Sequence, residues 1–218
     1  MKHVYLFVLL AIPFFGTSQT VEEINKPIIS ELDEVAPFSE GLAAVRKGNQ
    51  WGFIDKEGHL AIDFRDDVLW NREKDDHLGV SGIGYPAFKD GLCFIHKPDA
   101  EGISLYGFMN TKGETVIQPE YVNITSFDNG YAVGIYANKT LRGKNEFKLN
   151  IYDYKFTEVL VNKQGEMVWP VQERQNIVMS KRHFKLPELH AKMLTGDLLA
   201  VKGKDNQWKV VQLELKDN

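Results

Sequence analysis

One short cluster of side chains in this sequence could bind a metal or move protons. Asp75, Asp76 and His77 are consecutive. Carboxylates and imidazole are common metal ligands, and histidine can act as a general acid or base near neutral pH. The histidines that follow residue 18 form no H-x-H, H-x-x-H or H-E-x-x-H pair that would complete such a site. We therefore treat Asp75, Asp76 and His77 as surface candidates, and we expect no metal, no cofactor and no catalytic assignment.

Two glycine-rich patterns nearby superficially suggest other chemistry. The run Gly82-Ile83-Gly84-Tyr85-Pro86-Ala87 fits a phosphate-loop spacing, and Ser81 follows Gly79-Val80. A phosphate loop needs a preceding strand and a following helix, and Pro86 in mid-motif opposes that context. A serine nucleophile elbow needs glycine at position 83, where the chain has isoleucine. Both patterns therefore indicate an irregular loop.

The single cysteine excludes an intramolecular disulfide and a thiolate metal cluster. Cys93 stands in the strand-like run Leu92-Cys93-Phe94-Ile95, which predicts a small buried apolar side chain. The net charge of the 218-residue chain is −4, which is too small and of the wrong sign for a nucleic-acid-binding surface.

The N-terminus has the three parts of a secretory signal peptide. A basic start at Lys2 precedes the apolar run Val4–Phe15, and small residues follow up to Ser18. We expect cleavage between Ser18 and Gln19 and a secreted or periplasmic mature chain with no transmembrane segment. The apolar run is short for a membrane span, which needs about 20 residues.

A repeated stretch provides the elements that would position any site. Trp51–Gly58 (WGFIDKEG) is repeated as Tyr106–Gly113 (YGFMNTKG), and a degenerate third copy ends with Asn162–Gly165. A phenylalanine-glycine element precedes each copy: Phe38–Gly41, Phe88–Gly91 and Phe127–Gly130. Asp or Asn first and Gly last is typical of a type I turn that ends in the left-handed region. The glycine after Trp51 or Tyr106 predicts a close approach of the neighbouring strand.

Between these copies the chain predicts strands, loops and one helix. Leu42–Val45, Trp51–Ile54 and Leu60–Ile62, joined by tight turns, predict a three-stranded meander. Inserts at 65–87, 96–104 and 137–146 are expected as long loops, and Pro187–Leu194 is expected as a short helix. Leu199–Lys202 and Asn206–Val211 echo the first repeat as a terminal half-repeat.

These residues resemble the WG-repeat proteins, a bacterial family. The match is nearly complete over Phe38–Gly58, good over Phe88–Tyr121, and limited to the ends over Phe127–Gly165. The resemblance implies an all-β array of antiparallel β-meander or hairpin repeats, with a short helical insert near the C-terminus, and it carries no common catalytic residues. The structural repeat positions are Phe38, Gly41, Trp51, Gly52, Asp55, Gly58, Phe88, Gly91, Tyr106, Gly107, Asn110, Gly113, Pro119, Tyr121, Phe127, Gly130, Asn162 and Gly165.

The expected organisation has four parts: a signal peptide at 1–18, a lead-in segment at 19–37, the WG-repeat array at 38–170, and an insert with the terminal half-repeat at 171–218. We hypothesise an exported, non-catalytic binding or protein-interaction module whose partner is an unknown protein or an envelope glycan. The alternatives are an extracytoplasmic hydrolase with a loop-built site and a structural envelope protein. The argument comes from the repeat architecture and the absent motifs, which is reasoning at the level of the fold.

Overall fold

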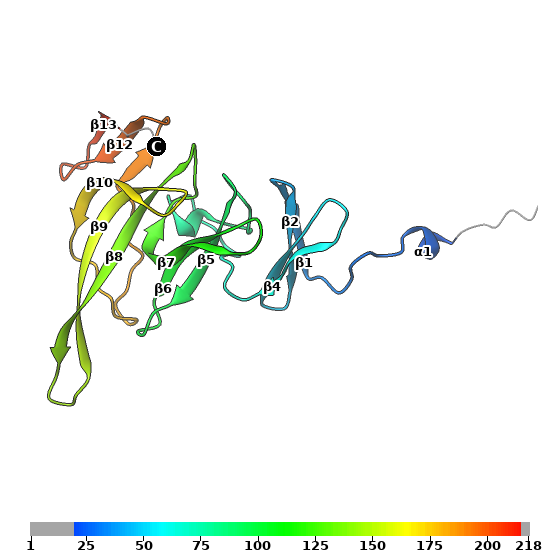
Figure 1. Cartoon of the computed structure of the whole chain (residues 1–218), viewed down its shortest axis with the longest axis horizontal. Helices are drawn as coiled ribbons and strands as arrows, with labels where there is room; N and C mark the ends of the chain where they lie inside the picture. Colours follow the sequence, from blue (N-terminus) through cyan, green and yellow to red (C-terminus); the bar gives the residue numbers. More distant parts are fainter. Residues whose placement is uncertain (1–19, 215–218) are drawn as a thin grey trace, which may run out of the picture. The chain divides into compact units, whose positions relative to one another are not determined.

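The computed structural model describes residues 20–214, and it divides at Ser30 and Glu31 into two compact units. The predicted signal peptide at 1–18 lies outside the described residues. The first unit contributes a single helical turn, α1 (Val21–Ile24), and the second contains every strand (Figure 1). All strand pairs are antiparallel, so the predicted all-β class is confirmed.

The first layer of the second unit is a four-stranded sheet in the order β1-β2-β3-β4. Its strands are β1 (Glu34–Ser39), β2 (Leu42–Lys47), β3 (Gln50–Ile54) and β4 (Leu60–Arg65). Each of β2 and β3 buries three consecutive residues, and tight turns join β2 to β3 and β3 to β4, so the predicted meander is confirmed. The 3-10 turn η1 (Val80–Gly82) lies in the segment that leaves this layer.

The second and third layers share one six-stranded sheet in the order β10-β9-β8-β7-β6-β5. The strands are β5 (Leu92–Pro98), β6 (Ser104–Asn110), β7 (Thr115–Ile124), β8 (Tyr131–Lys144), β9 (Asn150–Asn162) and β10 (Met167–Arg174). The first part of β7 pairs with β6 and its end pairs with β8, so β7 connects the two layers.

The terminal layer is a three-stranded sheet of β11 (Ala191–Met193), β12 (Leu198–Lys202) and β13 (Trp208–Gln212). The predicted helix at Pro187–Leu194 is wrong, because residues 191–193 form β11 and residues 187–190 are irregular. Ala191 and Leu189 are buried against the third layer, and pairing with β12 outweighs the local helix signal.

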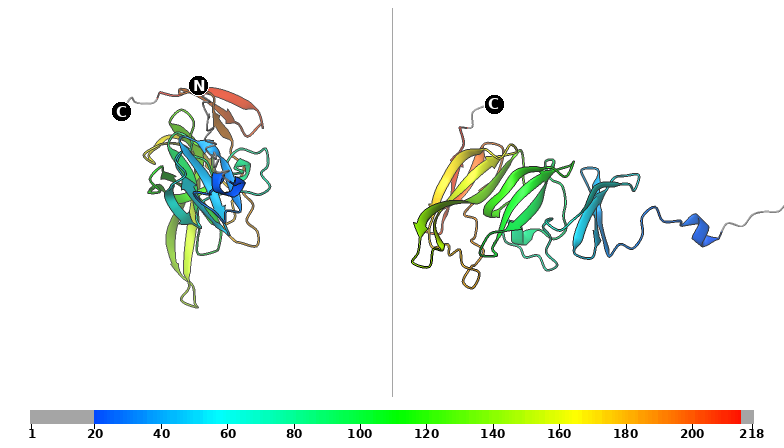
Figure 2. Two further views of the ribbon diagram at one scale, coloured as in Figure 1. Left: turned by 90° about the vertical axis from the view of Figure 1, so that its right-hand side faces the viewer. Right: turned by 60° about the horizontal axis from the view of Figure 1, so that its bottom comes forward.

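Figure 2 shows the sheets of this unit following one another, and a separate apolar core joins each layer to the next. Residues of β3 and β4 pack with residues of β5 and β6 in the first core, which includes the buried Cys93. The second core joins β5–β7 to β8 and β9, and the third joins β8 and β9 to the terminal layer. Burial raises the pKa of the Cys93 thiol to about 12, so this cysteine behaves as the predicted apolar side chain.

One aromatic contact recurs between layers. Phe53 of the first layer meets Phe88 with ring centroids 5.0 Å apart, and Phe108 of the second meets Phe127 at 4.9 Å. Both contacts are edge-on, which is a favoured geometry for aromatic pairs. Phe38 begins the first repeat and has no preceding layer in this unit, and its side chain is 53% exposed.

Two kinds of turn also recur along the array. Glu40-Gly41, Asp90-Gly91 and Asn129-Gly130 each place both residues at positive φ, as a two-residue hairpin turn requires. The carboxylates link consecutive turns, because Glu40 accepts a hydrogen bond from the Gly91 N–H and Asp90 accepts one from the Gly130 N–H, each at 2.7 Å.

The second kind of turn begins with Asp or Asn. The Oδ1 atom of Asp55 accepts hydrogen bonds from the N–H groups two and four residues later, and Asn110 and Asn162 repeat this arrangement. Gly58, Gly113 and Gly165 then adopt φ of 80–85° at the left-handed position.

The inserts agree only in part with the expected long loops. The 65–87 segment is irregular and residues 72–78 are exposed, as expected of a loop, but Val68, Leu69 and Val80 are buried, and Asn71 donates to the carbonyls of Val80 and Ile83. The expected loop at 137–146 is wrong, because β8 continues as strand to Lys144 opposite β9. Residues 138–146 are mostly polar or charged, so the strand there depends on its pairing with β9.

Candidate functional site

The repeat positions lie in layers and turns. The aromatic side chains at Trp51, Phe88, Tyr121 and Phe127 are buried, whereas Phe38 is exposed and Tyr106 is half-buried. Gly52 and Gly107 lie where the following strand crosses closely. A Cβ on Gly107 would stand 2.3 Å from the Ile117 carbonyl oxygen, and one on Gly52 would stand 3.1 Å from that of Ile62. The turn positions are Gly41, Asp55, Gly58, Gly91, Asn110, Gly113, Gly130, Asn162 and Gly165, and Pro119 lies in β7.

The third repeat holds a glutamate at the position of Trp51 and Tyr106, four residues before the recurring turn. Glu158 is fully buried and accepts hydrogen bonds from Arg174 at 2.8 Å, Gln172 at 3.0 Å and the Ala191 N–H at 3.0 Å. The His190 N–H also donates to it. A buried carboxylate with this many donors fixes the terminal layer on the third layer.

The candidates Asp75, Asp76 and His77 lie on the 65–87 segment. Asp75 Oδ2 lies 3.4 Å from His77 Nδ1, and hydrogen bonds from the His77 backbone and from Ser81 lower the pKa of the Asp75 carboxyl. Among residues 20–214, no group of three or more His, Cys, Asp or Glu is placed to hold a metal ion. The three candidates are therefore not placed to hold a metal ion.

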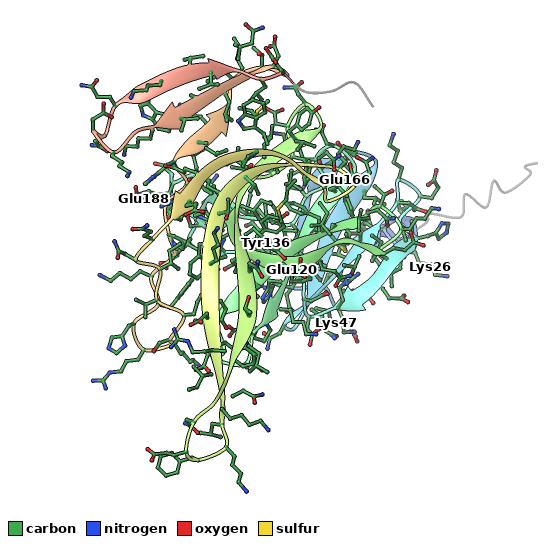
Figure 3. All side chains as sticks on the ribbon, turned by 60° about the vertical axis from the view of Figure 1, so that its left-hand side comes forward. Lys26, Lys47, Glu120, Tyr136, Glu166 and Glu188 are labelled. Carbon is green, nitrogen blue, oxygen red and sulfur yellow. The ribbon has the colours of Figure 1, made fainter. Side chains whose placement is uncertain are left out.

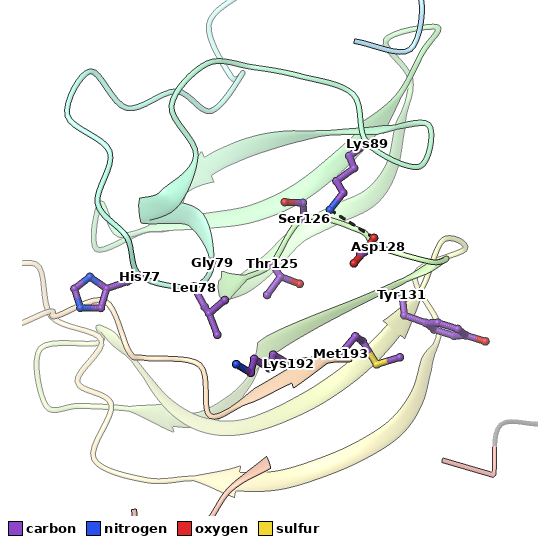
Figure 4. Close-up of a pocket in the computed structure, with 10 residues that line it drawn as sticks. All are labelled: His77, Leu78, Gly79, Lys89, Thr125, Ser126, Asp128, Tyr131, Lys192 and Met193. Atoms are coloured by element: carbon purple, nitrogen blue, oxygen red, sulfur yellow. Dashed lines mark ion pairs between the residues drawn. The ribbon is translucent and has the colours of Figure 1, made fainter. Parts of the chain in front are cut away.

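His77 borders a polar pocket of about 290 Å³ (Figure 4). The 65–87 segment supplies one wall, and residues of the third and terminal layers supply the others. Lys89 Nζ lies 3.6 Å from Asp128 Oδ1 in an ion pair. The Thr125 hydroxyl accepts a hydrogen bond from the Val133 N–H. The remaining lining residues, which add further hydroxyl and ammonium groups, are Leu78, Gly79, Ser126, Tyr131, Lys192 and Met193.

The most prominent surface feature is the hairpin of residues 138–155, which we call the arm. It extends β8 and β9 beyond the buried pair Ala137 and Phe156 and projects from the layers (Figures 1 and 3). Pairing places Lys139 opposite Tyr154 and Leu141 opposite Tyr152 on one face. That face continues outward from the third core without a layer of this unit over it.

The side chains of the arm are unusually apolar for their exposure. Five large apolar residues are exposed on it, and they are Leu141 (53%), Phe147 (76%), Leu149 (63%), Ile151 (38%) and Tyr152 (39%). Exposed apolar groups that cluster in this way mark interaction surfaces more often than single ones do.

The arm is also basic. It carries five cationic side chains and two carboxylates, hence a net charge of +3, while the chain as a whole carries −4 and the remainder therefore −7. The cations are Lys139, Arg142, Lys144, Lys148 and Lys155, and the acids are Glu146 and Asp153. The arm is therefore an apolar and cationic element on an acidic protein.

Contacts within the arm hold its shape. The Lys139 ammonium lies 4.1 Å from the ring centroid of Tyr152, and the Tyr154 ring stacks on Phe156 at 5.9 Å. An ion pair of 2.9 Å joins Arg142 to Asp153. These contacts tie the stem of the arm to the third core, so the arm presents its side chains on a fixed strand pair.

The tip repeats the turn of the array with one substitution. Asn145 Oδ1 accepts hydrogen bonds from the N–H groups of Phe147 and Leu149, as Asp55 does from Glu57 and His59. Lys148 occupies the left-handed position, with φ of 61°, where the other copies have glycine. In the sequence, the basic residues and the turn at Asn145 are the signals that could have indicated the arm. The sequence analysis expected a loop there and did not predict the pairing of β8 with β9.

Stacked antiparallel layers with two recurring turns define an all-β repeat protein. The chain matches the family model described as the WG containing repeat at residues 23–51, 51–65 and 106–133. These three matches confirm the WG repeats that the sequence predicted. No curated protein and no solved structure matches the chain. Over residues 20–214, no helix is long and apolar enough to cross a membrane.

Proposed function

We propose that this WG-repeat protein is an exported, non-catalytic binding module that contacts a component of the cell envelope through the arm. The repeat layers act as a rigid scaffold, and the arm is the element that this scaffold presents. The family match is consistent with a repeat-based interaction module.

The observation that carries this proposal is the exposure of Phe147 and Leu149 at the tip of the arm. Each residue is more than 60% exposed, although both belong to a turn that Asn145 holds by hydrogen bonds through its side chain and its backbone. Folding of the layers gains nothing from apolar groups in water, so their benefit must come from a contact outside the chain.

Export is a separate part of the proposal and is supported by the residues before Gln19. A basic start, an apolar run and small residues up to Ser18 are the signals that the secretory machinery recognises. Expression of the full chain in its host, with cell fractionation and mass spectrometry of the N-terminus, tests it. A mature chain beginning at Gln19 outside the cytoplasm is expected, and an intact Met1 in the cytoplasm would contradict export.

Binding is tested with the mature chain and a variant that lacks the outer arm. Residues 141–152 are replaced by Asn-Gly, which joins the paired residues Thr140 and Asp153 through a short hairpin turn. Cosedimentation with isolated host envelopes measures binding. We expect the mature chain to sediment with the envelopes and the shortened variant to remain in solution.

The matched control removes exposed apolar side chains elsewhere. Phe38 is 53% exposed on the first layer and Val210 is 61% exposed on the terminal layer. The double variant Phe38→Ser, Val210→Ser should bind envelopes as the mature chain does. Equal binding by the shortened variant and the mature chain would show that the arm is not the contact element.

A further inference from the structure

We propose that the arm docks the protein on an anionic lipid surface, with Phe147 and Leu149 entering the boundary between headgroups and acyl chains. This inference rests on the proposed use of the arm as the contact element. It names the kind of surface that the arm fits, and it does not depend on which side of a membrane the protein meets.

The first argument is shape. The two most exposed apolar residues of the arm stand at a convex hairpin tip, between Asn145 and Asn150. A convex tip offers a partner no groove, so its apolar groups leave water by inserting into whatever covers them. An interfacial lipid layer accepts such groups to a depth of about 5–10 Å.

The second argument is charge. The arm carries a net charge of +3 on a chain whose remainder carries −7. Lys144 and Lys148 flank the apolar tip, and the long stems of lysine side chains allow the ammonium groups to reach phosphates while apolar neighbours insert. Anionic lipids attract cations near the surface, whereas the acidic remainder of the chain is repelled from it. The charge distribution therefore orients the arm toward the lipid.

The third argument is the position of the tyrosines. Tyr152 pairs with Leu141, and it lies two positions after Asn150, where the turn ends and β9 begins. At a strand rise of about 3.4 Å per residue, Tyr152 lies about 7 Å behind the turn. Tyrosine rings with a polar hydroxyl favour the headgroup level of a bilayer. With Lys139 over its ring, Tyr152 is placed at that level when the tip is inserted.

The fourth argument is Lys148 itself. At the equivalent left-handed position the repeats have Gly58, Gly113 and Gly165, which adopt positive φ without a steric penalty. Lys148 adopts φ of 61° with a side chain, which is a less favourable choice for the turn. A cation is thus present at the tip where the fold alone favours glycine, and contact with an anionic surface accounts for it.

The test uses the mature chain, Gln19–Asn218, and vesicles of phosphatidylcholine with or without about one third phosphatidylglycerol. Cosedimentation should show that the mature chain binds the anionic vesicles. The double variant Phe147→Ser, Leu149→Ser should lower the partition coefficient by at least about tenfold, and the double variant Lys144→Glu, Lys148→Glu should lower it by a similar factor. Raised salt should weaken binding. Phe38→Ser, Val210→Ser is the matched control and should bind as the unmodified chain does.

Three results would overturn the lipid inference, and the first of them leaves the proposed function intact. Absence of binding to anionic vesicles, together with arm-dependent binding to host envelopes, excludes lipid as the partner and supports a protein or glycan. Vesicle binding that the tip variants leave unchanged excludes the arm as the lipid contact. Size-exclusion chromatography with light scattering measures the oligomeric state of the unmodified chain and of the tip variants. If the unmodified chain is a dimer and the Phe147→Ser, Leu149→Ser variant is a monomer, the tip contacts a second copy, and that result also overturns the lipid inference.

Discussion

Glu158 forms an ion pair of 2.8 Å with Arg174 at the position where the first two repeats have Trp51 and Tyr106. On the following strand, Trp51 lies opposite Arg65 and Tyr106 lies opposite Tyr121. Glu158 lies opposite Gln172 in the same way. The third repeat thus exchanges an aromatic ring for a buried carboxylate. This carboxylate also accepts the backbone N–H groups at which the terminal layer begins, and the exchange links the two layers.

Replacing Glu158 by alanine should destabilise the protein by about 3–5 kcal/mol. The change removes the carboxylate that pairs with Arg174, which is 11% exposed at its side chain and still donates to the Glu188 carbonyl, and it leaves the His190 and Ala191 N–H groups without this acceptor. Urea unfolding followed by circular dichroism measures the loss. Glu173→Ala, which removes a solvent-exposed partner of Lys155, is the control and should leave the midpoint unchanged. Similar midpoints for both variants would contradict the linking role of Glu158.

Gly107→Ala should cost more stability than Gly52→Ala. The added Cβ would lie 2.3 Å from the Ile117 carbonyl oxygen at position 107, and 3.1 Å from the Ile62 carbonyl oxygen at position 52. Overpacking of this kind costs about 1–3 kcal/mol, and backbone in contact with the new group cannot move as a side chain can. Gly196→Ala meets nothing within 4 Å and is the control. If all three variants unfold at the same urea concentration, the close approach of the neighbouring strand at Gly52 and Gly107 does not limit stability.

Phe88→Ala should destabilise by about 3–5 kcal/mol, since the ring is buried between two layers against Phe53. Phe38→Ala removes the corresponding ring of the first repeat, which is half exposed, and should have little effect. Thermal unfolding compares the two. A larger loss for Phe38 than for Phe88 would show that the contact between layers is not the stabilising one.

Stability should fall as the pH decreases from about 7 to about 5. Burial lowers the pKa of His96 and of His190, and Arg174 lowers that of His190 further. Below the ordinary histidine pKa of 6.5 the unfolded chain takes up protons that the folded chain does not, so folding weakens until the lowered pKa values are passed. Melting temperatures at pH 7.5 and 5.5 measure the change. His96→Gln, His190→Gln should reduce this dependence, and His183→Gln, at an exposed position, should preserve it.

The repeated turns made most of the fold predictable. Asp55, Asn110 and Asn162 mark turns that depend on local side-chain hydrogen bonds, and such local rules are legible in a sequence. The layer order follows because consecutive repeats are neighbours. The helix expected at Pro187–Leu194 failed because its apolar residues are buried by distant strands, and pairing with β12 is invisible to local propensity.

The candidate site was less accessible from the sequence. Asp75, Asp76 and His77 attract attention by residue type, but no other acid, histidine or cysteine converges on them to hold a metal among the described residues. The arm was hidden because basic and polar residues at 137–146 are typical of a loop, while its register depends on residues 150–156 across the turn. Glu158 could have been found by aligning the three repeats on their turn residues Asp55, Asn110 and Asn162. In that alignment Glu158 takes the position of Trp51 and Tyr106.

The most direct test of the account compares the mature chain with the variant in which Asn-Gly replaces residues 141–152. Envelope binding and thermal unfolding are measured on the same preparations. We predict an unchanged melting temperature, because the replaced residues lie outside the three cores, together with loss of envelope binding. Binding equal to that of the unmodified chain at the same melting temperature would contradict the claim that the arm is the contact element.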